Sequence, residues 1–217
     1  MANKSANRSR AQRLRWLLRR ERELWDEGRQ RVAGVDEAGM GPLAGPVVAA
    51  AVIFPPGKGL KGVRDSKQLT AARRVELAEE IRGESLAWAV VPVAPGEIDT
   101  LNIYHAGLVA MRRAIEGLNP RPDFLLVDGR RLHAIGIPHE TVIKGDGRCH
   151  AIAAASILAK TIRDALMVRY DAEYPGYDFA THKGYPTSAH RDAIRRLGPS
   201  PIHRRSFNLL PQPRLFD

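Results

Sequence analysis

Three short apolar runs of this sequence end in carboxylates, and these acids are the first candidates for chemistry. Asp36 and Glu37 close the first run, Asp128 closes the second and Asp146 the third. Carboxylates brought to one place repel each other and raise each other's pKa unless a cation neutralises them. Such hard oxygen ligands suit Mg²⁺ or Mn²⁺ better than zinc. Two such ions about 3.5–4 Å apart could activate a water and stabilise the leaving oxygen of a phosphodiester.

A structural role for the same acids must be weighed against this one. An aspartate at a strand end is often a turn-former or a helix cap. For Asp146 both interpretations stand on the sequence alone. For Asp36 and Glu37 the structural role is weaker, because an adjacent acidic pair after a buried apolar run is costly without a partner.

The elements that would position these acids alternate between strands and helices. Segments 31–39 and 45–54 are predicted to be two strands joined by a Gly- and Pro-rich turn, and 85–93 a third. Helices are expected over 10–28, 70–83, 102–118, 149–174 and 187–198, with short strands at 123–129 and 140–146. This order predicts an α/β fold with a mixed central sheet flanked by helices.

Charge is concentrated at the two ends of the chain, which has 217 residues and a net charge of +10. Residues 1–31 hold ten Lys and Arg against four acids, and residues 182–217 hold seven against two. Basic ends around a near-neutral body suggest a polyanionic partner, although solubilising tails are also common. The single cysteine, Cys149, excludes a disulfide framework, and no membrane span or signal peptide is seen, so we expect a cytoplasmic location.

Eight motifs resemble those of one family in order and spacing. The first is GVDEAGMGPLAGPVVAAAVI at 34–53. The others are DSKQL at 65–69, LNIYHAGLVAM at 101–111, LLVDG at 125–129, IKGD at 143–146, AAASILAKTIRD at 153–164, HKGYPT at 182–187 and HRRSF at 203–207. Together they resemble ribonuclease HII, the type 2 ribonuclease H family.

The resemblance implies an RNase H-like fold and endonucleolytic cleavage of the RNA strand of RNA–DNA hybrids. It also implies incision 5′ of single ribonucleotides embedded in DNA, leaving 3′-hydroxyl and 5′-phosphate ends, with Mn²⁺ or Mg²⁺. The family's four catalytic and metal-binding acids match Asp36, Glu37, Asp128 and Asp146, and Asp146 is expected to hold the second of two ions more loosely.

One departure from the family pattern lies beside the first two acids. Family members usually have Gly-Arg-Gly where this chain has Gly39-Met40-Gly41, a tripeptide that grips the backbone around the ribonucleotide. Main-chain contacts to the ribose survive this exchange, whereas a cationic contact to phosphate does not. Four cations could replace that contact: Lys67, Lys144, Lys183 or Arg148.

Tyr185 in HKGYPT matches the family tyrosine that stacks on the sugar at the deoxyribose side of the junction. The alternative is ordinary half-buried packing. Four other side chains suggest mainly structural roles: His182 as a hydrogen-bonding group, Arg163 and Asp164 as an intrahelical ion pair, and Arg204 as a tie between the C-terminal segment and the body. Ser66 could contact phosphate or lie in a plain polar turn.

The chain divides by motif into a basic helical extension (1–30), a catalytic domain (31–207) and a tail (208–217). In the tail Gln212, Leu215 and Phe216 fit the Gln-x-x-Leu-Phe pattern of bacterial peptides that bind the sliding clamp. The helix at 10–28 could follow duplex phosphates or simply pack its Leu and Trp side chains on the body. Two alternatives to an active enzyme are a hybrid-binding module with impaired catalysis and another RNase H-like nuclease, such as a junction resolvase.

Overall fold

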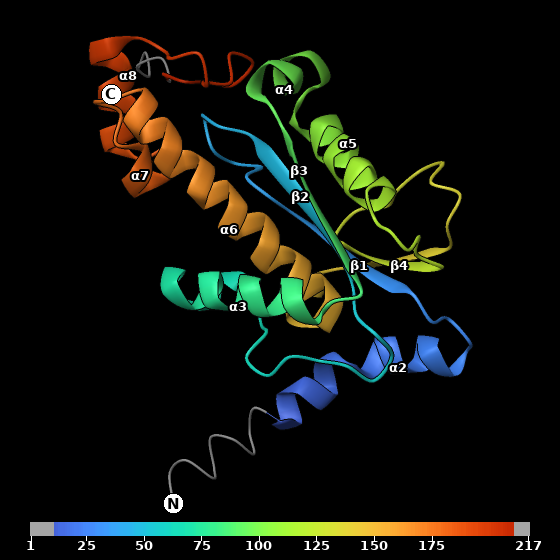
Figure 1. Cartoon of the computed structure of the whole chain (residues 1–217). Coiled ribbons are helices and arrows are strands. Elements are labelled where there is room, and N and C mark those ends of the chain that lie inside the picture. The colour runs from blue at the N-terminus through green and yellow to red at the C-terminus, as the bar shows by residue number, and fades with distance from the viewer. Residues whose placement is uncertain (1–10, 211–217) are drawn as a thin grey trace, which may run out of the picture.

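The computed structural model describes residues 11–210 and is built around one mixed sheet (Figure 1). Its strand order is β3-β2-β1-β4-β5. The antiparallel half contains β3 (Ala87–Val93), β2 (Val47–Ile53) and β1 (Val32–Ala38), and β4 (Phe124–Asp128) and β5 (His139–Val142) run parallel to β1. The predicted mixed sheet and α/β class are confirmed.

Helices cover both faces of the sheet, which explains why every residue of β2 is buried. On one face lie α3 (Ala71–Glu84) and the long α6 (His150–Glu173); on the other lie α4 (Pro95–Leu101) and α5 (Ile103–Glu116) (Figure 1). The side chains of β2 alternate between these layers: Val48 and Ala50 pack with α3 and α6, and Val47 and Ala49 with α5.

Close packing of α6 on β1 depends on Gly34. A Cβ at this position would stand 2.0 Å from the backbone carbonyl carbon of Ala151, so no other residue allows the helix to approach as near. This contact fixes the distance between α6 and β1, and with it the position of the helix residues that face Asp36.

The N-terminal segment forms two helical pieces where one helix was predicted. Residues 11–17 are helical, a turn follows at Leu18, and α2 (Arg19–Asp26) continues to near Gly28. Leu17, Leu18 and Leu24 are buried, and the carboxylate of Glu21 accepts a hydrogen bond of 2.9 Å from the N–H of Ala151 in the first turn of α6. This segment is therefore packed firmly on the body.

Short elements account for most of the remaining differences from prediction. The sequence did not predict α4, the four-residue α7 (Phe179–His182) or the 3-10 turns η1 (Ser66–Gln68) and η2 (Gly145–Gly147). Thr70 caps α3 as predicted, but the helix runs past Gly83. The last helix, α8 (Ser188–Leu197), begins after Thr187 and ends at Gly198. No helix among residues 11–210 is long and apolar enough to cross a membrane.

Candidate metal centre

All four candidate acids lie at one edge of the sheet, because β1, β4 and β5 run parallel and their carboxyl ends face the same way. Asp128 is the last residue of β4, and Asp146 lies in η2 directly after β5. Asp36 and Glu37 are inside β1 rather than at its end, since pairing with β2 continues to Ala38.

Strand register determines which acids are neighbours. The parallel pairing of Val35 with Val127 places Asp36 and Asp128 beside each other one step later. Val35 and Val127 both face α5, so the alternation of a strand turns Asp36 and Asp128 toward α6 and Glu37 toward the α5 side. The acids therefore reach the edge from both faces of the sheet.

Asp36 is the most deeply buried of the four, with 5 % of its surface exposed. Burial raises its pKa well above the ordinary value, and the charges of Glu37 and Asp128 raise it further. Hydrogen bonds from the Ser156 hydroxyl and from the N–H of Glu37, the latter 2.7 Å long, act in the opposite direction. Ser156 in turn bonds the hydroxyl of Ser66 at 3.0 Å, so the Ser66 side chain is buried and does not face a phosphate.

Glu37 and Asp128 show the same tendency. Burial raises the pKa of both carboxyls; Arg130, whose Nε lies 3.3 Å from Glu37 Oε1, lowers that of Glu37 while the charge of Asp128 raises it. Asp128 Oδ1 accepts a 2.5 Å hydrogen bond from the N–H of Gly145. Glu37 Oε2 is buried and has no hydrogen-bond partner among the described residues.

Asp146 completes the group through a cation rather than through a cap. Its Oδ2 lies 3.7 Å from Nζ of Lys67, and its charge contributes to the raised pKa of Asp128. Lys67 has 82 % of its side chain exposed, and its own pKa is affected most by burial, then raised by Asp146, Asp65, Asp36 and Asp128. The predicted acids and Lys67 thus form one electrostatic cluster.

The donor chemistry of this cluster fits a hard divalent cation. Its donors are carboxylate oxygens, three of its carboxyl pKa values are raised, and one buried oxygen lacks a partner. In the rotamers of the described chain no three Asp, Glu, His or Cys side chains meet closely enough to hold an ion. Glu37 and Asp146 instead face Arg130 and Lys67, from which a side-chain rotation would free them.

The turn after β1 is held from below by two fully buried arginines, Arg163 of α6 and Arg204. Arg204 donates to three carbonyls, those of Gly39 at 2.6 Å, Met40 at 3.3 Å and Gly45 at 2.9 Å. It therefore ties the C-terminal segment to the body, as predicted, and does so through the Gly39–Gly41 turn. Its pKa is lowered to about 9 by burial, so it stays charged at neutral pH.

Arg163 supports the other end of this turn, and the predicted ion pair with Asp164 is wrong. Its Nε donates to Pro46 O, and one terminal nitrogen donates to Ala44 O and Lys183 O at 3.1 and 3.0 Å. Asp164 lies on another side of α6 and pairs with Lys160 at 2.7 Å and with Arg74 at 3.1 Å. A Cβ at Gly39, where φ is +97°, would stand 2.2 Å from Arg163 Nε.

The predicted substrate-binding residues fall into two sets. Met40 and Tyr185 lie near the buried arginines: Met40 packs against the α5 layer, and Tyr185, 41 % exposed, lies with its ring 5.7 Å from Lys160 Nζ and 5.8 Å from the Arg163 guanidinium. Lys183 belongs to the same segment, but its ammonium donates to Ala180 O. Lys144 is exposed beside Asp146, in a left-handed conformation that begins η2.

His182 has a structural role, as predicted. Its Nε2 bonds Tyr177 O at 2.7 Å and its Nδ1 accepts from the N–H of Gly184 at 3.1 Å. These contacts shape the segment that carries Tyr185. A backbone hydrogen bond of 2.8 Å from Leu43 to Gly184 O joins this segment to the turn after β1, which makes one continuous surface from the acids to Tyr185.

Two residues of the cluster were missed in the sequence. Arg130 follows Asp128 by two positions, a spacing too common to signal an ion pair with Glu37 on the neighbouring strand. Ser156 left a stronger signal, since an isolated hydroxyl in the apolar run AAASIL of a buried helix requires a hydrogen-bond partner.

A mixed sheet with carboxylates at its parallel edge and cations around them is the arrangement of RNase H-like nucleases. The family model described as Ribonuclease HII matches residues 33–210. The chain therefore belongs to the ribonuclease HII family.

Curated relatives and solved structures agree with this assignment. A Ribonuclease HII of Myxococcus xanthus is 57 % identical over 202 residues, covering 93 % of this chain and 69 % of the relative, and one of Moorella thermoacetica is 57 % identical over 187 residues, covering 86 % and 91 %. The RNase HII of Archaeoglobus fulgidus, solved as a PCNA:RNase HII complex, has a TM-score of 0.72 and 28 % identity over 85 % of this chain and 98 % of that one. The predicted endoribonuclease activity on RNA–DNA hybrids is confirmed at the family level, as is its dependence on metal, and a junction resolvase is excluded.

Proposed function

We propose that Asp36, Glu37, Asp128 and Asp146 are the catalytic acids of this ribonuclease and hold Mn²⁺ or Mg²⁺, two ions during cleavage. The observation that carries the proposal is the mutual rise of the carboxyl pKa values at one sheet edge. Ions held there would activate a water and stabilise the leaving oxygen of the RNA phosphodiester.

The chain's own residues supply position and charge for this reaction. Ser156 and the N–H of Glu37 hold the Asp36 carboxylate in one orientation, and the N–H of Gly145 does the same for Asp128. Arg130 and Lys67 stand beside Glu37 and Asp146 as countercharges. Once ions neutralise the acids, both cations are available to a substrate phosphate, which makes Lys67 a substrate-binding residue in this proposal.

Recognition of the ribonucleotide is assigned to the surface between the acids and Tyr185. Gly39, Met40 and Gly41 would contact the ribose through main-chain groups, since Arg204 fixes the carbonyls of the first two. The exposed ring of Tyr185 would stack on the sugar that follows. Lys144 and Lys183 complete the set as phosphate contacts.

A duplex with one embedded ribonucleotide tests this function directly. With Mn²⁺ or Mg²⁺ we expect incision on the 5′ side of the ribonucleotide, leaving a 3′-hydroxyl and a 5′-phosphate, and no incision in EDTA. Binding without incision in either metal would establish the catalytically impaired alternative. Incision that persists in EDTA would overturn the metal assignment.

The tail carries a second, separate proposal. Gln212, Leu215 and Phe216 lie outside the described residues, and their pattern fits docking in a clamp groove. The PCNA complex of the Archaeoglobus fulgidus relative supports a clamp as partner. Clamp capture by the full chain and by a chain ending at Leu210 should differ, and equal retention would contradict the proposal.

The domain division and the location remain proposals of the same kind. The family match over residues 33–210 supports a catalytic domain near 31–207, with 1–30 as a basic addition and 208–217 as a tail. A DNA substrate and a single free cysteine are consistent with a cytoplasmic location.

A further inference from the structure

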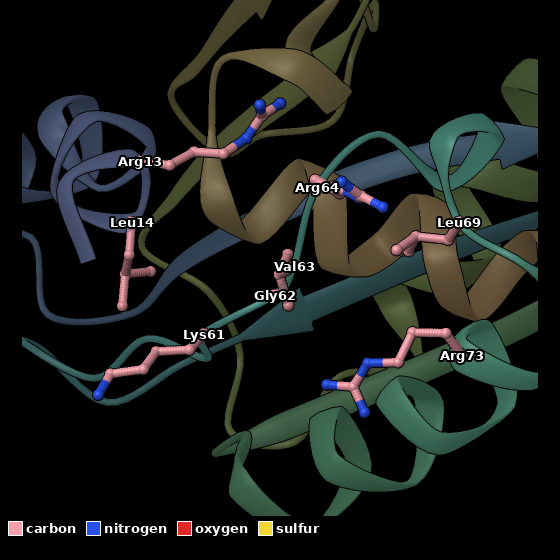
Figure 2. A pocket seen from close by; sticks show the side chains of 8 residues that line it. All are labelled: Arg13, Leu14, Lys61, Gly62, Val63, Arg64, Leu69 and Arg73. Atoms are coloured by element: carbon pink, nitrogen blue, oxygen red, sulfur yellow. The ribbon is translucent and has the colours of Figure 1, made fainter. Parts of the chain in front are cut away.

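A basic pocket lies beside the metal centre, between the N-terminal helix and the loop that precedes α3 (Figure 2). Its volume is about 230 Å³. Three segments supply its walls: the helix at 11–17, the loop at 61–69 and the first turn of α3. The lining residues are Arg13, Leu14, Lys61, Gly62, Val63, Arg64, Leu69 and Arg73.

The charge of this pocket is of one sign. Four of its lining residues are basic and none is acidic. Within residues 11–210, Arg13, Lys61 and Arg64 form no salt bridge, whereas Arg73 is held by Glu76 at 2.8 Å and Glu80 at 3.1 Å. Uncompensated cations around an apolar floor are the form of an anion-binding site.

Arg64 carries the most specific indication of a ligand. One of its terminal nitrogens donates to Gln68 O at 2.9 Å, which fixes the guanidinium. Its Nε is buried and has no hydrogen-bond partner among the described residues. A buried donor without a partner is costly, and an anion in the pocket would satisfy it.

The N-terminal helix is held well enough to act as one wall. Leu14 and Leu18 pack on Gly59, where an added Cβ would stand 2.9 and 2.8 Å from their methyl groups. Leu17 and Leu18 are buried, and Glu21 bonds the start of α6. This wall precedes residue 33, where the match to the family model begins, so the pocket is built partly from outside the family core.

The pocket and the metal centre share one loop. Val63, Arg64 and Leu69 line the pocket, while Lys67 reaches Asp146. Arg64 and Lys67 are three residues apart, so their Cα atoms are at most about 11 Å from each other. A nucleic-acid strand with its scissile phosphate at the acids would place phosphates at this range, because its charges recur about every 3.4 Å along the helix axis.

We propose that this pocket binds a backbone phosphate of the substrate duplex, a few nucleotides from the scissile bond. The inference rests on the proposed metal centre for its placement, and on the pocket's own charges for its chemistry. Arg13, Lys61 and Arg64 make the contact, and the apolar floor holds their side chains in place. The site adds affinity for long substrates without taking part in cleavage.

A matched pair of triple variants tests the proposal. In one, Arg13, Lys61 and Arg64 are replaced by alanine; in the control, the exposed Arg15, Arg19 and Arg22 are. Both lose the same charge, but only the first loses the pocket. We expect the slope of log K against log salt for a long hybrid to fall by about 1 in the pocket variant and to stay unchanged in the control. The cleavage rate at saturating substrate should be the parent's in both.

A scan with the parent protein keeps the test independent of folding. A neutral methylphosphonate is placed at one phosphate at a time along the RNA strand and then along the DNA strand. At one position, whose strand identifies the source of the phosphate, the parent should lose about 10-fold in affinity and the pocket variant nothing. Equal salt slopes for pocket variant and parent, or no position with this behaviour, would overturn the proposal. Loss of metal-dependent cleavage at saturation would instead count against the metal centre.

Discussion

Two regions of this molecule bury charges of one sign, and they do so in opposite ways. At the sheet edge, Asp36, Glu37 and Asp128 raise each other's pKa, and one oxygen of Glu37 has no partner. Beneath the turn after β1, Arg163 and Arg204 are completely buried, but backbone carbonyls accept most of their N–H groups.

The difference separates a permanent arrangement from one completed by a ligand. Carbonyl dipoles compensate the arginines inside the chain itself, so this pair stabilises the turn whether or not substrate is present. The acids have too few donors for their charge, and a cation from outside would supply what the fold does not. The following changes test this comparison, beginning with the largest expected effect.

Asp36→Asn should reduce hybrid cleavage by roughly 1,000-fold or more, because a metal site contributes several kcal/mol of transition-state stabilisation. The metal-free protein should become more stable, since the amide removes a buried charge repelled by Glu37 and Asp128. Single-turnover cleavage and urea unfolding measure the two effects. Asp192→Asn, on an exposed side chain of α8, is the control. A variant that cuts at the parent rate would show that Asp36 is no ligand.

Arg204→Met should lower the free energy of unfolding by about 3 kcal/mol or more, because the carbonyls of Gly39, Met40 and Gly45 lose their donors. The neighbouring Arg205→Met should change it by less than about 0.5 kcal/mol, since that side chain is exposed. Denaturant unfolding compares the two. Similar small losses in both variants would mean that the buried arginine is not what holds the turn.

The acidic edge was predictable from sequence because its cause is local and periodic. Apolar runs ending in carboxylates indicate strands whose ends meet at one sheet edge, and the order of motifs supplied the family. The extension of β1 beyond Asp36 was not predictable in this way, since it depends on pairing with β2.

The buried arginines could not be read from the sequence for a different reason. Their acceptors are backbone carbonyls 117 to 165 positions away, and every residue has a carbonyl. The spacing of Arg163 and Asp164 suggested a helical ion pair, but burial turned the arginine toward the turn. Likewise α7, with four residues, is too short to show a helical period.

Glu21 offers a buried acid that lies outside the metal centre. Burial raises its pKa to about 7 from 4.5, so between these values the folded chain binds a proton that the unfolded chain has lost. Its contribution to stability therefore falls as pH rises from 4.5 to 7, by about 2–3 kcal/mol. Glu21→Gln should remove this loss and stabilise the protein at pH 8 but not at pH 4.5.

Unfolding of parent and variant at both pH values measures the effect, with the exposed Glu27→Gln as control. Taking the difference between variants cancels the histidines, whose lowered pKa values act in the opposite direction. Mn²⁺ should leave the Glu21 effect unchanged, which would separate this acid from the sheet edge. If parent and Glu21→Gln show the same pH dependence, the carboxyl is ionised in the folded state at pH 5 and the burial argument fails.

Met40→Arg places an exposed cation between the two regions and should have the smallest effect. Its backbone is already fixed by Arg204, so the turn should keep its shape, with a small loss of stability where Met40 Sδ packs 3.2 Å from the Cβ position of Gly107. One added phosphate contact should steepen the slope of log K against log salt by about 1 and tighten hybrid binding several-fold at low salt. Met40→Gln, long and polar but neutral, controls for shape. A steeper slope in the arginine variant alone would show that the turn lies on the phosphate path; equal slopes in both would show that the buried arginines and the rim lysines already neutralise that phosphate, leaving residue 40 a packing position.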